Sequence, residues 1–226
     1  MRPRLAQLGE GLRRGEVAWT QRQNGLAGRI RQAYASAMPF LYHARPPDMR
    51  GEMLYPLNLL RAIHPDLYEH QRGKYAGREA LLELRIPILE VLWNDALHLS
   101  PLHPYHLAAA WRAAGLSSPA WECGFFKIPL ERIDRHRCVW FANGEVAVND
   151  TPRTAPLALP VSEITRFDPI AYEELVQPPA SYREYLRRRR ERGRRPRPFA
   201  HIPHVLVAAP IDVAGLPQVR ADLAPG

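Results

Sequence analysis

Short apolar runs, each ended by prolines or a turn signal, alternate with helix-like stretches along most of this chain. The run Phe40-Leu41-Tyr42-His43 stops at Arg45-Pro46-Pro47, which is typical of a buried strand that leads into a turn. A second such run, His204 to Ala208, lies near the C-terminus. Because short strands interleave with helices, the sequence predicts an α+β fold.

The same patterns predict the remaining elements. Further strands are expected near 51–56, 96–99, 124–128, 137–141 and, after an Asn143-Gly144 hairpin turn, 145–148. Helices are expected over 57–63, from Pro65 onward, over 104–114, within 167–176 and over 181–192.

The length of 226 residues, of which 46% are hydrophobic, suits one domain with an extension. Leu5, Leu8 and Leu12 follow helical spacing, so residues 1–37 are expected to form a helical N-terminal extension. Residues 38–226 are then a single α+β domain with a basic helix at about 181–195.

Several classes of protein are excluded by what the sequence lacks. No apolar run approaches the roughly 20 residues that span a bilayer, and no signal-peptide segment follows the N-terminus. A cytoplasmic protein without membrane contact is therefore expected. Walker A, Gly-x-Gly-x-x-Gly, Gly-x-Ser-x-Gly, His-Glu-x-x-His and Cys-x-x-Cys motifs are all missing, which argues against the commonest nucleotide and hydrolase sites.

Positive charge is the strongest compositional signal. The formal net charge is +8, and nine arginines lie between positions 183 and 197 against Glu184 and Glu191 alone. Helical spacing predicts one stripe of arginines that contacts nucleic acid, DNA or RNA, made of Arg183, Arg187, Arg190 and Arg194. Tyr182 and Tyr185 are expected to offer stacking surfaces beside it. The alternative is a solvated helix with no such partner.

The chain has nine histidines, and the tightest group is His98, His103 and His106. Two prolines interrupt this group, and its spacing matches no standard ligand pattern, so no metal is expected. A metal there would need a further ligand such as Asp95, which the sequence alone does not decide.

Three segments, 54–58, 74–79 and 93–101, resemble a group of uncharacterised bacterial proteins of about this size. The match runs from about residue 39 to 220 and implies no particular function.

A second resemblance is to ADP-ribosyltransferases of the DarT type, which modify DNA bases. Leu41-Tyr42-His43-Ala44 is similar to the strand that opens their catalytic domain, and Leu97-His98-Leu99-Ser100-Pro101 to a mid-domain strand and turn. Pro203-His204-Val205-Leu206-Val207 is similar to the strand that carries their catalytic glutamate. The resemblance implies a split mixed sheet with helices, and NAD as the substrate that donates ADP-ribose.

The resemblance also implies site residues. His43 and Tyr55 would hold NAD, Arg78 would meet its phosphates, and His43, His98 and His204 would act in catalysis. Arg45 replaces the family's threonine, and His204 replaces the glutamate. The carboxylates left for that role are Glu52, Glu79 and Asp95, and the histidines equally fit an RNA 2′-phosphotransferase-like branch of the fold.

Two hypotheses follow. The first is an ADP-ribosyltransferase-like enzyme that uses NAD to modify nucleic acid, with an antitoxin or another protein as a further partner. The alternative is a non-catalytic nucleic-acid-binding protein whose histidines are structural.

Overall fold

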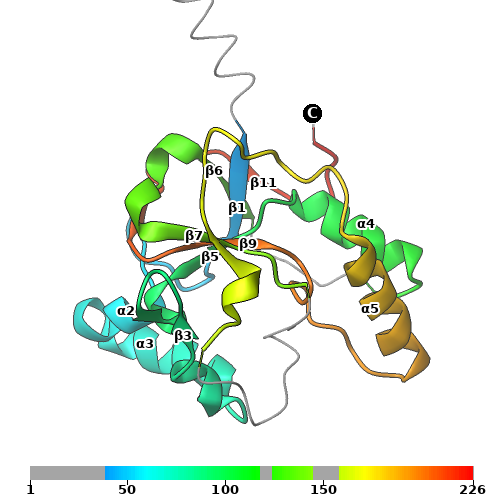
Figure 1. Ribbon diagram of the computed structural model, residues 1–226, viewed down its shortest axis with the longest axis horizontal. Coiled ribbons are helices and arrows are strands. Elements are labelled where there is room, and N and C mark those ends of the chain that lie inside the picture. The colour runs from blue at the N-terminus through cyan, green and yellow to red at the C-terminus, as the bar shows by residue number, and fades with distance from the viewer. Residues whose placement is uncertain (1–38, 118–123, 145–157, 226) are drawn as a thin grey trace, which may run out of the picture. The chain divides into compact units, whose positions relative to one another are not determined.

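The computed structural model describes residues 39–117, 124–144 and 158–225. The expected N-terminal helix over 1–37 and the strand at 145–148 lie outside these residues. Within them, helices combine with several small antiparallel sheets, which confirms the α+β class (Figure 1).

Two sheets form the centre of the domain. The first has the order β1 (Phe40–Ala44), β6 (Phe125–Pro129), β11 (Gln218–Val219). The second has the order β5 (Leu97–Leu99), β9 (His204–Val207), β7 (Cys138–Phe141), β8 (Ile164–Arg166).

The two sheets meet at one antiparallel bridge between Tyr42 and Ser100, whose backbones exchange two hydrogen bonds of 2.8 Å. Every ladder between named strands in the described part of the chain is antiparallel. Parallel pairing there is confined to isolated bridges, Arg85 with Ala158 and Leu102 with Leu175. The mixed pairing implied by the resemblance is therefore not present as a ladder.

Two smaller pairs complete the strands, β2 (Met53–Leu54) with β10 (Ile211–Asp212) and β3 (Arg85–Ile86) with β4 (Val91–Leu92). The ladder registers place His43 opposite Phe126 and His98 opposite Leu206. Both histidines thus stand on strands that the surrounding apolar ladders hold in place.

The described α-helices are α2 (Leu57–Ile63), α3 (Pro65–Arg72), α4 (Pro104–Ala113) and α5 (Ala180–Glu191). Helix α4 begins with Pro104 at its first turn, behind a His103 ring that accepts a hydrogen bond from the backbone of Tyr105. It ends at Ala113, and Gly115 just beyond the cap has a φ of 68°, the left-handed conformation that glycine adopts freely.

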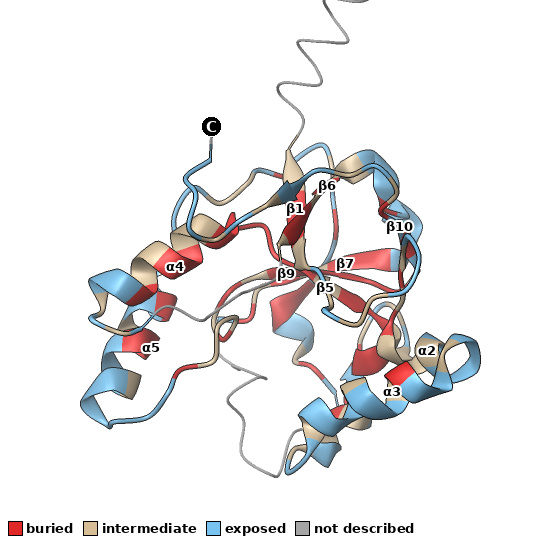
Figure 2. Ribbon diagram, turned by 180° about the vertical axis from the view of Figure 1, so that it is seen from behind, coloured by how far each residue is buried: buried red, intermediate tan, exposed pale blue. Residues whose placement is uncertain are grey.

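Helices α4 and α5 lie side by side, away from the pair α2 and α3 (Figures 1 and 2). The contact between α4 and α5 includes a hydrogen bond of 2.6 Å from the indole of Trp111 to the hydroxyl of Tyr182. The four residues of β9 are all buried in the middle of the sheet (Figure 2). No helix among the described residues combines the length and the apolar character needed to cross a bilayer.

The prediction of a helix within 167–176 is wrong. This segment is irregular: Tyr172 donates from its hydroxyl to the carbonyl of Phe40, and the backbone of Leu175 donates to Pro101. Contacts with distant strands outweigh its local helical preference.

Candidate functional site

A cavity of about 420 Å³ opens near the junction of the two central sheets. Its lining comes from the end of β1, from β2, from the start of β5, and from α2 and α3. This volume lies within the range of small-molecule sites. Residues far apart in the sequence therefore share one concave surface.

Three predicted residues, His43, His98 and Tyr55, line this cavity together. His204 does not line it, but its ring lies behind His98, with ring centroids 6.3 Å apart. The structure thus brings the three predicted catalytic histidines into one group, of which two face the cavity.

Burial keeps these histidines neutral. It lowers the pKa of His43 and His98 to about 4 each, and that of His204 to about 3. The electrostatic influence of neighbouring histidines lowers the pKa of His98 and His204 further, since each protonated ring would repel the next. At neutral pH these imidazoles are therefore unprotonated, and their low pKa values make them weak proton acceptors.

His98 is held in one orientation by Trp93. Its Nε2 lies 3.0 Å from the Trp93 carbonyl oxygen, and the two rings pack with centroids 4.0 Å apart. On His43, Nδ1 is buried and has no hydrogen-bond partner among the described residues. The same is true of Nδ1 on His204, which is only 5% exposed.

The positively charged side chains at the cavity do not include Arg78, which the resemblance implied. Arg78 is not among the lining residues, because its guanidinium bonds the Lys74 carbonyl and lies 5.6 Å from the centre of the Tyr75 ring. Arg45, Arg50 and Lys74 do line the cavity. They are the Arg and Lys side chains of the lining; Arg50 is paired with Asp66, and Lys74 donates to the side chain of Gln71.

The carboxylates expected to replace the missing glutamate do not line the cavity. Asp95 accepts hydrogen bonds from Asn58 and from the backbone of Leu92, at 2.8 and 2.9 Å. Glu79 accepts from the backbone of a nearby glycine, and Glu52 is exposed. Among the described residues, the one carboxylate in the lining is Asp48.

Sequence reasoning missed Asp48 and Asn94. Asp48 follows β1 and accepts hydrogen bonds of 2.7 and 2.9 Å from the side chain of Gln71. Asn94 lines the cavity in the short 3-10 helix Trp93–Asp95. No pattern in the sequence marks either residue, because their placement depends on the packing of α3 and β5 around the cavity.

The histidine group 98–106 is divided between two places. His103 packs on the ring of Tyr42 and lies 6.1 Å, centroid to centroid, from the ring of His106 at the start of α4. His98 instead belongs to the cavity. Within the ranges that the structure describes, no cluster of three or more histidine, cysteine or carboxylate side chains could hold a metal ion.

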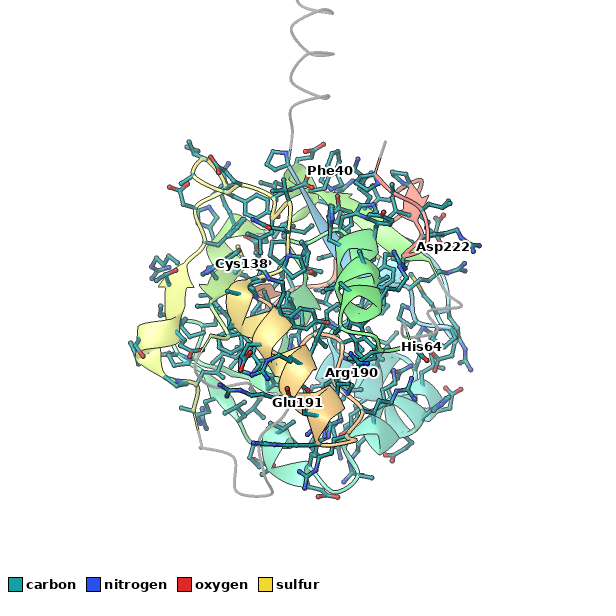
Figure 3. The ribbon with its side chains drawn as sticks, turned by 90° about the vertical axis from the view of Figure 1, so that its right-hand side faces the viewer. Phe40, His64, Cys138, Arg190, Glu191 and Asp222 are labelled. Carbon is teal, nitrogen blue, oxygen red and sulfur yellow. The ribbon has the colours of Figure 1, made fainter. Side chains whose placement is uncertain are left out.

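The arginine stripe on α5 is partly neutralised. Arg187 pairs with both Glu184 and Glu191, and the arginine neighbours of Glu184 hold the pKa of that carboxyl at about 2. Arg183 donates to the carbonyl of Pro178 at 2.7 Å. Arg190, labelled in Figure 3, has its guanidinium against Gly115 at the end of α4.

Of the predicted arginine stripe, Arg187 is therefore neutralised by glutamates of the same helix. The exposed arginines just beyond α5 are Arg192, Arg194 and Arg195. Tyr182 and Tyr185 are 0% and 6% exposed, so the prediction that they stack on bases is wrong. Their rings pack into the core between α4 and α5 instead.

No protein-family model, curated protein or solved structure matches the chain.

Proposed function

We propose that the chain is an ADP-ribosyltransferase-like enzyme that takes NAD as a substrate and modifies nucleic acid. The observation that carries the proposal is the convergence of His43, His98 and Tyr55 on one cavity beside the junction of β1 and β5. These residues come from segments that the sequence pattern alone would leave unconnected. Their meeting around a cavity of ligand size favours a binding site over scattered structural histidines.

The charges around the cavity suit a dinucleotide. Arg45 and Lys74 line it beside apolar residues of β2 and α2, so phosphates and rings would both find complementary groups. Tyr55 would pack against a ring of NAD. The proposed location is the cytoplasm, where NAD and nucleic acid occur together.

The proposed reaction breaks the bond between ribose C1′ and the nicotinamide nitrogen. Nicotinamide leaves with the bonding electrons, and a nitrogen or oxygen of the nucleic acid bonds to C1′. The proton lost by that nucleophile passes to a neutral imidazole, for which His43 and His98 are the candidates in the cavity. Asp48 supplies the negative charge closest in kind to the family's glutamate, and stabilises positive charge on the ribose.

The target would be held by the basic segment that ends α5. Residues 183–197 include nine arginines and only two glutamates, so a large excess of positive charge remains after the ion pairs of Arg187 are formed. Such an excess attracts polyanions through release of counterions.

The test is incubation of the purified protein with labelled NAD and separate DNA and RNA oligonucleotides. Released nicotinamide and the intact mass of each oligonucleotide are measured. We expect one ADP-ribose unit on one class of oligonucleotide, and at least about a hundredfold less product with His43→Gln. His136→Gln, which changes an exposed histidine, is the matched control and should react as the unaltered protein does.

The alternative remains a non-catalytic nucleic-acid-binding protein, favoured by the surviving positive charge beyond α5. It predicts oligonucleotide binding that weakens with salt and no release of nicotinamide. No product from either oligonucleotide class would refute the transferase proposal.

A further inference from the structure

Asn94 is a polar side chain with nothing to bind in the described structure. It is only 2% exposed, and both its Nδ2 and its Oδ1 are buried without a hydrogen-bond partner among the described residues. Buried amides are nearly always hydrogen-bonded, since an unpaired one loses its bonds to water and gains none. Asn94 also lines the cavity. The unpaired amide therefore belongs to a residue of the cavity wall.

The backbone on both sides of Asn94 is fixed. The Trp93 amide donates to the Leu84 carbonyl at 2.7 Å, and the Trp93 carbonyl lies 3.0 Å from Nε2 of His98. On the other side, the Asp95 carboxylate accepts from Asn58 and from Leu92. These contacts hold the short helix in place without using the amide of Asn94. The amide of Asn94 thus forms no hydrogen bond that would stabilise the ligand-free protein.

A side-chain amide presents one donor and one acceptor next to each other. Its best partner is a group with the same pair in reverse order, which can make two hydrogen bonds at once. A carboxamide has this pattern, and so does the N6/N7 edge of adenine. A carboxylate lacks the donor and would leave Oδ1 unpaired.

We propose that Asn94 is a specificity residue that binds the carboxamide of nicotinamide by two hydrogen bonds. This inference rests on the proposed use of NAD and adds the group that selects its nicotinamide end. The carboxamide is preferred to adenine because Asn94 adjoins the histidines: its neighbour Trp93 packs on His98, and His43 lines the same cavity. In the proposed reaction the histidines act at the ribose that carries nicotinamide.

The experiment measures calorimetric binding of free nicotinamide, nicotinic acid and adenosine to the full chain, to Asn94→Ala and to Asn94→Leu. The unaltered protein should bind nicotinamide in preference to the other two. Asn94→Ala leaves space in the cavity, so a loss of affinity cannot be steric. We expect nicotinamide binding at least about tenfold weaker in both variants.

Thermal unfolding of the free proteins separates this role from a structural one. An amide without partners contributes nothing to the free fold, so both Asn94 variants should melt at or above the temperature of the unaltered protein. Asn143→Gly is the matched control. Asn143 is a buried asparagine whose Nδ2 donates to Phe199 and Ile202, and its φ of 51° suits glycine. It should melt lower and keep its affinity for nicotinamide.

Each outcome bears on one proposal or the other. If both Asn94 variants melt as low as Asn143→Gly, or bind nicotinamide as tightly as the unaltered protein, the role of Asn94 is refuted, even where NAD is consumed. A preference for adenosine or nicotinic acid, or no binding of nicotinamide at all, refutes it as well. If nicotinamide binding depends on Asn94 but NAD is never cleaved, the specificity role stands and the transferase proposal fails.

Discussion

The buried histidines make the stability of the fold sensitive to mild acid. An ordinary histidine in the unfolded chain has a pKa near 6.5, whereas folding lowers the pKa of His204 to about 3. Above pH 6.5 both states are neutral and the difference has no effect. As the pH falls below 6.5, the unfolded state binds a proton that the folded state refuses, and the free energy of unfolding decreases.

The magnitude follows from the same shift. At pH 5 the unfolded form of one such histidine is favoured about thirtyfold by its proton, which amounts to about 2 kcal/mol. His43 and His98, with a folded pKa of about 4 each, border the cavity and add up to about the same amount apiece. We therefore expect a loss between about 2 and 6 kcal/mol from pH 7.5 to pH 5.

Urea denaturation at pH 7.5, 6.5 and 5.0 measures this loss, in a range above the titration of most carboxylates. His204→Gln should remove about 2 kcal/mol of the pH dependence, while the exposed control His136→Gln should leave it unchanged. NMR titration of the imidazoles in the unaltered protein is a second measurement that does not depend on the variant folding. A change below about 0.5 kcal/mol, or buried imidazoles that titrate near pH 6.5, would refute the reasoning.

Two further predictions concern α5. Tyr182→Phe removes a hydroxyl that accepts from Trp111 and donates to the carbonyl of Pro198. In urea denaturation it should lower the free energy of unfolding by about 2–4 kcal/mol, whereas the control Tyr105→Phe should lower it by less than about 0.5 kcal/mol. Equal losses in the two variants would contradict the role of these hydrogen bonds. Glu184→Gln releases the arginines paired with it, so binding of an oligonucleotide should tighten and depend more steeply on salt, as measured by fluorescence anisotropy. An unchanged salt dependence would place the contact elsewhere.

Local patterns in the sequence were enough to predict most of the elements. The apolar run at 40–43 forms β1, the run at 204–208 forms the buried strand β9, and the alanine-rich stretch after Pro104 forms α4 with Gly115 at its end. These features depend on side-chain alternation, helix caps and backbone preferences, which act over a few neighbouring residues. The prediction of a helix at 167–176 failed because a contact with the distant strand β1 holds that segment, and local patterns do not record such contacts.

The functional group of residues is only partly a property of the sequence. A resemblance of short motifs singled out His43, His98 and His204, but only the pairing of β5 with β9 and the bridge beside β1 brings them together. The charges of α5 could be counted from the sequence, yet packing against α4 decides that Tyr182 is buried and that Arg190 lies on Gly115.

Asn94 shows what the tertiary structure alone decides. Its two neighbours, Trp93 and Asp95, are held by contacts with His98, Leu84 and Asn58, and these contacts leave Asn94 in the wall of the cavity with its amide unpaired. The sequence determines that the chain carries an amide at this position. Whether that amide meets water, a hydrogen-bond partner or a cavity depends on the chain segments that pack around it. Hydrophobic packing has no direction, so it brings residues together regardless of their separation along the sequence.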